Sequence, residues 1–142
     1  MKKYKIGYTT GVFDMFHIGH LNILKKAKEM CDYLIVGVST DELVEEYKNK
    51  KPVIQFADRK AIVEAIRYVD LVVDQTTMDK MEAWKQHHFD VMFHGDDWKG
   101  SAMYEQTEKA LKEVGCDMVF LPHTVGISST ELSKTLYYYL HE

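Results

Sequence analysis

Apolar residues along the chain follow two alternating patterns that predict an ordered series of strands and helices. Short, nearly continuous apolar runs are typical of strands, and we expect these at Lys5–Thr10, Tyr33–Val38, Leu71–Val73, Val91–Phe93 and Met118–Leu121. Apolar positions three and four residues apart predict helices at His20–Cys31, Asp58–Tyr68, Met78–His87 and Tyr104–Val114. Hydroxyl residues followed three positions later by glutamate predict two more helix starts, at Ser39–Glu42 and at Ser128–Glu131, the last helix reaching about His141.

This alternation predicts an α/β fold. We expect residues 1–142 to form a single-domain, Rossmann-like, doubly wound parallel five-stranded sheet with helices on both faces. Ligands of such sheets bind outside the carboxyl ends of the strands, where the strand order reverses. Polar clusters follow four of the predicted strands, at Asp14 to His20, Lys48 to Lys51, Asp96 to Asp97 and His123 to Thr130. We therefore expect these clusters to converge on one site.

Composition narrows the function classes. Charged residues make up 28% of the chain, as in an ordinary soluble protein, and no apolar run reaches the length of a membrane span. No secretory signal core follows the basic start, so we expect a cytoplasmic protein. A net charge of −4 argues against nucleic acid as a partner, although local cations can still hold a nucleotide. Cys31 and Cys116 form no C-x-x-C pair, which predicts buried free thiols.

The segment after the first strand carries the strongest chemical signal. His17 and His20 stand three apart at the start of a predicted helix, with Gly19 between them. Residues at this spacing face the same way, and a helix start offers free N–H groups and the positive end of the dipole. Glycine lets a phosphate approach the backbone closely. A zinc fragment is the alternative, but the third protein ligand that zinc needs is absent from the pattern. We therefore predict a phosphate-handling centre.

The sequence His17-Ile18-Gly19-His20 resembles the H-x-G-H signature of the cytidylyltransferase-like superfamily of nucleotidyltransferases. Three later segments are similar to motifs of the glycerol-3-phosphate cytidylyltransferases and their choline- and ethanolamine-phosphate relatives: Arg67–Asp70 (R-Y-V-D), Gly95–Trp98 (G-D-D-W) and Gly126–Thr130 (G-I-S-S-T). Their order matches from Tyr8 to about Leu136, and the short chain is most similar to the bacterial glycerol-3-phosphate enzymes.

The resemblance implies transfer of CMP from CTP to a small phosphorylated alcohol, with release of pyrophosphate. Glycerol 3-phosphate, giving CDP-glycerol, is the first expectation; ethanolamine phosphate, choline phosphate or another polyol phosphate stay open. An ATP-using adenylyltransferase of the same superfamily and a nucleotide-binding module without turnover are the rival interpretations. The resemblance also implies Mg²⁺ as cofactor, held by the CTP phosphates near Asp14 and not by a protein cage, and assembly as a homodimer.

The resemblance further assigns residues to roles. The expected catalytic residues are His17, His20, Lys48 and Arg67. The expected nucleotide-binding residues are Thr10, Gly11, Val12, Phe13, Asp14, Gly19, His20, Gly95, Asp97, His123, Thr124, Gly126, Ile127, Ser128, Ser129 and Thr130. The expected substrate-binding residues are Lys48, Lys50, Arg59, Asp70, Asp96 and Trp98. Competing interpretations are a solvated charge run for the lysines, structural salt bridges for Arg59, Arg67 and Asp70, and a plain helix cap for Ser128.

Three departures from the family pattern concern the substrate side. His123 stands where the family usually has arginine, and histidine is a weaker phosphate clamp than a permanent, forked cation. The segment Lys99–Cys116 is longer than expected after G-D-D-W, and Val12 replaces a frequent threonine. We expect these changes to affect triphosphate affinity and the acceptor more than the type of reaction.

Overall fold

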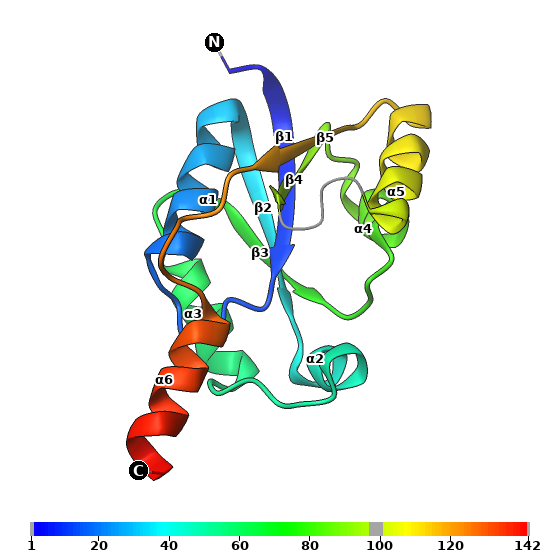
Figure 1. The fold of residues 1–142 in the computed structure, drawn as a ribbon. Helices are drawn as coiled ribbons and strands as arrows, with labels where there is room; N and C mark the ends of the chain where they lie inside the picture. Colours follow the sequence, from blue (N-terminus) through cyan, green and yellow to red (C-terminus); the bar gives the residue numbers. More distant parts are fainter. Residues whose placement is uncertain (1, 97–100, 142) are drawn as a thin grey trace.

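The computed structural model describes residues 2–96 and 101–141, and it confirms the predicted α/β fold (Figure 1). The elements in chain order are β1 (Tyr4–Gly11), α1 (Ile18–Met30), β2 (Cys31–Ser39), α2 (Asp41–Lys48), α3 (Phe56–Glu64), β3 (Leu71–Gln75), α4 (Lys80–His87), β4 (Val91–Gly95), α5 (Ala102–Glu113), β5 (Asp117–Leu121) and α6 (Ser129–His141). The five strands form one parallel sheet in the order β3-β2-β1-β4-β5.

Two apolar layers cover the sheet, one on each face. On one face, Leu24 of α1 and Val63 of α3 are fully buried against Phe93 of β4 and its neighbours. On the other, Leu111 of α5 packs with Tyr8 of β1. Successive side chains of a strand point to opposite faces, so the continuous apolar runs of the sequence supply both layers at once.

The strand order reverses between β1 and β4. β1 pairs with β2 on one side and with β4 on the other, and the chain crosses the sheet to reach the second half. The crevice between their carboxyl ends is where a doubly wound sheet binds its ligand. Two further helices, α2 and α6, lie beyond this end of the sheet (Figure 1). They supply side chains to the crevice rather than to the two apolar layers.

Several element boundaries differ from the prediction. The first helix begins at Ile18 and not at His20, because the side chain of His17 caps it. Helix α3 ends at Glu64, short of the predicted end at Tyr68. Thr40 caps α2 through its side chain, whereas the hydroxyl of Ser39, the predicted cap, donates to Oε1 of Gln75 at 2.6 Å. Ser39 is still part of the sheet, and a buried hydroxyl takes the partner that the neighbouring strand provides.

Other predictions are confirmed. The hydroxyl of Ser128 accepts a hydrogen bond from the N–H of Glu131 at 3.0 Å, as expected of the cap of the last helix. Cys31 and Cys116 are buried free thiols. Among the described residues, no helix is long and apolar enough to cross a membrane.

Candidate active site

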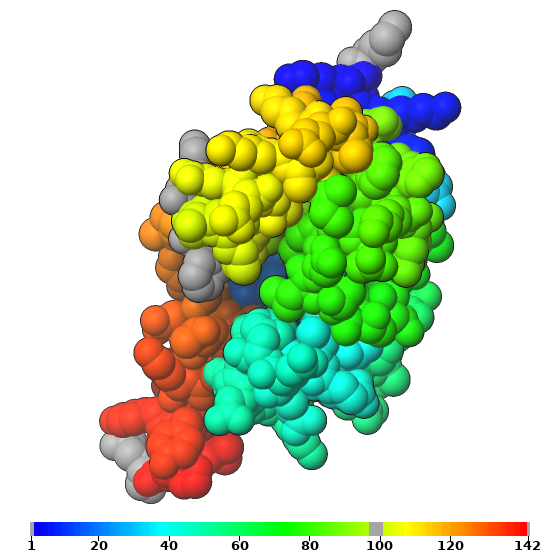
Figure 2. Space-filling view, turned by 90° about the vertical axis from the view of Figure 1, so that its right-hand side faces the viewer, coloured from blue at the N-terminus to red at the C-terminus, as the bar shows by residue number. Residues whose placement is uncertain are grey.

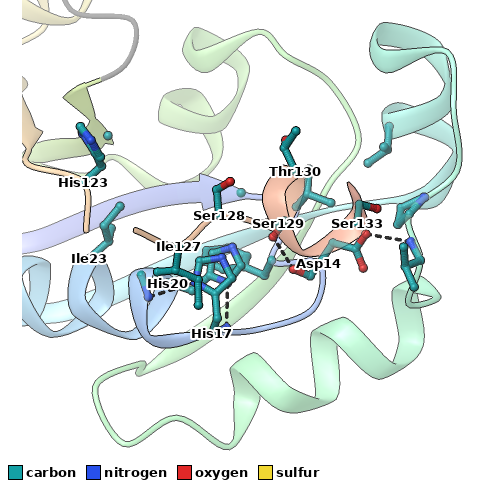
Figure 3. Close-up of a pocket in the computed structure, with 18 of the residues that line it drawn as sticks. Asp14, His17, His20, Ile23, His123, Ile127, Ser128, Ser129, Thr130 and Ser133 are labelled. Carbon is teal, nitrogen blue, oxygen red and sulfur yellow. Dashed lines mark hydrogen bonds between the residues drawn. The ribbon is translucent and has the colours of Figure 1, made fainter. Parts of the chain in front are cut away.

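A cavity of about 460 Å³ opens at the carboxyl ends of β1 and β4 (Figure 3). Most of the predicted nucleotide-binding residues line it, from three separate segments of the chain. They are Thr10, Gly11, Val12, Phe13, Asp14, Gly19, His20, Gly95, His123, Thr124, Ile127, Ser128, Ser129 and Thr130. The predicted catalytic residues His17 and Lys48 and the predicted substrate-binding Lys50 line the same cavity. The clusters that are distant in sequence therefore do meet in one place.

The loop from β1 to α1 is tightly turned. Phe13 and Met15 have φ angles of 55° and 48°, in the left-handed region that side chains other than glycine rarely adopt. Burial of the Phe13 ring, which is 6% exposed, anchors this loop to the core. Such backbone conformations persist where the surroundings impose them, and they concentrate at functional sites. Here the turn delivers His17 to the start of α1.

His17 and His20 hold each other through the backbone of the helix start. Nδ1 of His17 accepts a hydrogen bond from the N–H of Gly19 at 3.0 Å, and Nδ1 of His20 accepts one from the N–H of His17 at 3.2 Å. Because both Nδ1 atoms are acceptors, the proton of each neutral ring must lie on Nε2. The two rings stack with centroids 4.0 Å apart, so both Nε2–H groups belong to one small site.

Electrostatics keep these rings neutral. Burial, followed by the proximity of His17, lowers the pKa of His20 to about 4, and burial also lowers the pKa of His17. Nε2 of His17 is buried and has no hydrogen-bond partner. Among the described residues, it is the one buried side-chain nitrogen or oxygen for which this holds. An unsatisfied buried donor costs free energy, which an incoming phosphate oxygen recovers. The pair is therefore built to donate two N–H groups to an anion.

Gly19 has a second reason to be glycine. A Cβ atom at this position would lie 2.8 Å from Cε1 of the His17 ring and 3.0 Å from its Nδ1. The sequence predicted that the glycine allows close approach of a phosphate, whereas the structure adds that the ring of His17 itself occupies the space. The glycine therefore fixes the orientation of His17 as well as opening the helix start.

The start of α6 forms part of the wall of the same cavity. Ile127, Ser128 and Ser129 line it; Ile127 lies beside the histidine pair, whereas the hydroxyl of Ser128 points away from the pair (Figure 3). The Ser129 hydroxyl donates to the carbonyl oxygen of Asp14 at 2.6 Å, which ties the start of α6 to the β1–α1 loop. The amide of Asn22 in α1 donates to the hydroxyl of Thr124 at 2.9 Å. Two helix N-termini, of α1 and α6, thus converge on one cavity and favour bound anions.

The basic segment is held in place by Asp14. The Asp14 carboxylate accepts hydrogen bonds from the N–H groups of Val53 and Ile54, at 2.7 and 2.9 Å. The segment before Val53 then brings Lys48 and Lys50 to the cavity wall, with Lys51 beside them. Burial, and then the charge of Lys50, lowers the pKa of Lys48. The contact thus places Asp14 as the anchor of this cationic wall.

Arg59, predicted to bind substrate, has another role in this structure. Its side chain is 1% exposed and does not line the cavity. Its guanidinium donates to the carbonyl oxygens of Ile54, Val12 and Ser39 and to the Asp41 carboxylate, all within 2.6–2.8 Å. These four hydrogen bonds use at most four of the five guanidinium N–H groups. The bonds join the loops that follow β1 and β2. Arg59 therefore fits the competing interpretation, a structural salt bridge, and not the predicted substrate-binding role.

Arg67 and Asp70 lie away from the cavity. They precede β3, so they stand at the amino end of that strand, opposite the edge where the cavity opens. The Asp70 carboxylate pairs with the ammonium of Lys28 and accepts from the N–H of Leu34. Arg67 is exposed in the turn after α3, over the ring of Tyr68. Within one chain, Arg67 and Asp70 therefore do not line the cavity. The predicted direct catalytic contact of Arg67 and the predicted substrate contact of Asp70 are corrected in this respect.

The G-D-D-W segment is described only in part. Asp96 is not among the described lining residues; its carboxylate contacts Nδ1 of His123 at 2.9 Å, and this hydrogen bond lowers the pKa of Asp96. The contact joins the end of β4 to the loop after β5 at the rim of the cavity. The predicted residues Asp97 and Trp98 lie outside the described residues. Gly126, with φ of +91°, forms the turn before α6 rather than the wall.

Lys80 and His94 are polar residues at or near the cavity that were not among the predicted site residues. Lys80, at the start of α4, is 7% exposed, its ammonium donates to the Thr10 hydroxyl at 3.2 Å, and burial lowers its pKa to about 8. His94 lines the cavity from the end of β4. A polar residue closing an apolar strand was a visible signal for His94. Burial of Lys80 has no signal in sequence, because lysine at a helix start is usually solvated.

A Rossmann-like sheet that directs two histidine N–H donors, two helix N-termini and a cationic wall into one crevice defines a nucleotidyltransferase type of site. Comparison with known proteins makes this specific: the family described as cytidylyltransferase-like matches residues 8–135. The chain belongs to this family, as the motifs predicted.

Individual relatives cover most of the chain. It is 38% identical over 129 residues to the glycerol-3-phosphate cytidylyltransferase of Bacillus subtilis, covering 90% of this chain and 94% of that protein. It is 37% identical over 139 residues to the ethanolamine-phosphate cytidylyltransferase of Dictyostelium discoideum, where it spans 38% of the longer protein and 93% of this chain is covered. In fold it is similar to the lipopolysaccharide core biosynthesis protein of Thermoplasma volcanium, with TM-score 0.70, 24% identity and coverage of 85% and 97% of the two chains.

Proposed function

We propose that this protein transfers CMP from CTP to glycerol 3-phosphate, forming CDP-glycerol and pyrophosphate. The observation that carries the proposal is the pair of rings of His17 and His20, whose Nδ1 atoms are fixed by the backbone of the helix start and which both line the cavity. Similarity over nine-tenths of the chain to a glycerol-3-phosphate cytidylyltransferase supports this choice of substrates.

The proposed reaction is an in-line displacement at the α-phosphorus of CTP. An oxygen of the acceptor phosphate attacks, and the bond to the pyrophosphate oxygen breaks. The acceptor is already largely a dianion at pH 7, since the second pKa of a phosphomonoester is about 6, so no general base is required. His17 and His20 then donate hydrogen bonds to oxygens whose negative charge grows in the transition state. Lys48, Lys50 and the start of α6 hold the triphosphate in line.

The charges of the cavity favour an acceptor without an ammonium group. Among the described lining residues, Asp14 alone carries a carboxylate. Its two oxygens already accept hydrogen bonds from the N–H groups of Val53 and Ile54. The ammonium of Lys80 lies behind Thr10, where it attracts a phosphate and repels a cationic head group. This argument favours glycerol 3-phosphate over ethanolamine phosphate and choline phosphate.

We also propose Mg²⁺ as the cofactor, bound chiefly through the phosphates of CTP. No group of three metal-ligating side chains occurs among the described residues, whereas the cavity is rich in phosphate donors. An Mg²⁺ ion carried by the nucleotide fits this arrangement, and the carboxylate of Asp14, which lines the cavity, would be the available protein ligand. Bound in this way, Mg²⁺ neutralises phosphate charge; the alignment and hydrogen bonding come from the residues named above.

We further propose that the protein works in the cytoplasm as a homodimer. Two buried free thiols suit a reducing compartment. For the dimer, we place the interface at β3, which is an edge strand. Its residue Leu71 is 40% exposed and follows the turn Arg67–Asp70, whose two end residues are exposed. Sedimentation equilibrium tests the assembly: a dimer that Leu71→Lys converts to monomers supports this edge, and a monomeric wild-type chain contradicts the proposal.

The function is tested by pyrophosphate release. Purified protein with Mg²⁺ is assayed with CTP or ATP and with glycerol 3-phosphate, ethanolamine phosphate, choline phosphate or a sugar phosphate. We expect release with CTP and glycerol 3-phosphate well above every other pair. Release with ATP would identify an adenylyltransferase, and tight CTP binding without release from any acceptor would identify a binding module; either result contradicts the proposal.

A further inference from the structure

We propose that His94 is a specificity-determining residue that hydrogen-bonds a hydroxyl group of the acceptor alcohol. The inference rests on the proposed function, in which a phosphorylated alcohol attacks CTP. It assigns to His94 the recognition of the alcohol portion of that acceptor, separate from the phosphate chemistry of His17 and His20.

The sheet places His94 and the catalytic histidines on different faces. Alternation along β4 buries Phe93 in the layer under α1 and turns His94 toward α4 and α5. The His94 ring meets the edge of the Tyr104 ring of α5, with centroids 4.5 Å apart and an interplanar angle of 70°. His20 instead packs against Phe13, which belongs to the α1 layer. The cavity thus has a catalytic side and an α4–α5 side.

In-line transfer assigns these two sides. The attacking and leaving oxygens lie on opposite sides of the α-phosphorus. The starts of α1 and α6 meet on one side, and the proposed function places the pyrophosphate there, because helix N-termini favour anions. The acceptor must therefore approach from the side of α4 and α5, which is where His94 and Thr10 face the cavity.

The surface has an opening on that side. Figure 2 shows a hollow bordered by α2 in cyan, α4 in green, α5 in yellow and the orange segment that leads into α6, with blue atoms of the first part of the chain at its bottom.

The chemistry of His94 suits a hydroxyl. Burial, followed by the charge of Lys80, lowers the pKa of His94 to about 4, so its ring is neutral near pH 7. A neutral imidazole offers one N–H donor and one nitrogen acceptor. The hydrogen bond of His94 with the Gly95 backbone, which raises the pKa, uses the N–H donor, so the nitrogen acceptor is left for a hydroxyl group. The Tyr104 ring restricts the orientation of the imidazole, which makes the contact selective. The nearby ammonium of Lys80 disfavours an acceptor that carries an ammonium group in place of a hydroxyl.

The test compares acceptors that differ only in hydroxyl groups. Values of kcat/KM are measured for glycerol 3-phosphate, 3-hydroxypropyl phosphate and propyl phosphate, with wild type, His94→Ala and His94→Gln. We expect wild type to prefer glycerol 3-phosphate over propyl phosphate by about 100-fold or more, because a site built for a hydroxyl leaves its polar group unpaired otherwise. His94→Ala should reduce that preference at least about tenfold, and the glutamine, which keeps a donor and an acceptor, should recover part of it.

Controls separate this role from others. His141→Ala, at the exposed end of α6, should match wild type in every assay. The CTP dissociation constant of His94→Ala, measured by calorimetry, should stay within about twofold of wild type, since the proposed contact is to the acceptor. An equal loss with all three acceptors, or weakened CTP binding, overturns the role of His94. Absence of turnover by the wild type with glycerol 3-phosphate contradicts the proposed function itself.

Discussion

The backbone N–H of His17 donates to Nδ1 of His20, while Nδ1 of His17 accepts from the N–H of Gly19 in the first turn of the same helix. The motif therefore acts as a helix cap and as a phosphate site with the same two side chains. Capping fixes which nitrogen carries the proton, and stacking of the rings fixes where both protons point. Local folding and catalysis are coupled in this way, so a substitution at either histidine affects both unless it is chosen to separate them.

The two functions of His17 can be separated by amide substitutions. His17→Asn keeps a cap acceptor near the place of Nδ1 but loses the donor at Nε2, whereas His17→Ala loses both. We expect both variants to raise the barrier by about 2.7–4 kcal/mol, as for removal of an oxyanion donor. His17→Ala should also unfold at a lower temperature, because a lost cap costs about 1 kcal/mol. Steady-state kinetics and calorimetry measure these effects; near-full turnover by either variant contradicts the assignment.

Gly19→Ala tests whether the glycine positions the His17 ring. The new Cβ would lie 2.8 Å from Cε1 of that ring, so the ring must move. Displacement of a catalytic group by about 1 Å costs roughly 100-fold, and we expect kcat to fall by about that factor. Thermal unfolding should change little, because alanine favours the helix. An active variant would show that the ring has room to adjust.

Arg59 should be important for folding and for the shape of the cavity edge, without touching substrate. Arg59→Met leaves the carbonyl oxygens of Val12, Ile54 and Ser39 without their donor, and each buried polar group left unsatisfied costs about 1–3 kcal/mol. The variant should therefore lower the free energy of unfolding in urea by about 3 kcal/mol or more. Hydrogen bonds from Phe56 and Arg59 outweigh burial and lower the pKa of Asp41 from 3.8. The resulting stability is complete above pH 3.8 and is lost as pH falls through the lower folded-state value; the variant should lose most of this dependence.

Lys80 should impose a pH limit on acceptor use. Its pKa of about 8 means that the free enzyme loses this positive charge as pH rises above 8. We expect kcat/KM for glycerol 3-phosphate to fall above pH 8, by up to about tenfold per pH unit, since this ratio reports the free enzyme. Lys80→Met should have a lower kcat/KM and lack this alkaline decline. An identical decline in the variant would assign the titration to another group.

His123→Arg should strengthen CTP binding. Arginine is permanently charged and forked, and histidine is a weaker phosphate clamp, so we expect a gain of about fivefold. The change replaces the contact of His123 with Asp96 by an arginine–carboxylate pair at the same rim. Isothermal titration calorimetry with CTP, on the wild type and the variant, measures the effect. An unchanged or weaker affinity would mean that this position does not reach the triphosphate.

Patterns that are local in sequence gave the elements and the family. The continuous apolar run around Leu34 and Val36 predicted a buried strand, and the hydroxyl of Ser128 predicted a helix cap; both are confirmed. The prediction for Ser39 was wrong by one residue, because pairing with β3 extends β2 and gives that hydroxyl a buried partner in Gln75. Local patterns contain no information about such a partner, which lies 36 residues away.

The sequence by itself determined the strand order along the chain, the histidine motif and the convergence of polar clusters, because these depend on periodicity and on neighbouring residues. Only the tertiary structure decided which polar side chains reach the cavity. Arg59 turns inward to join the loops that follow β1 and β2, and Asp70 meets Lys28 at the far end of the sheet. Lys80 instead contacts Thr10, and His94 lines the cavity. The reason is physical: a long charged side chain takes its role from the partners that packing brings within reach, and these partners come from other elements.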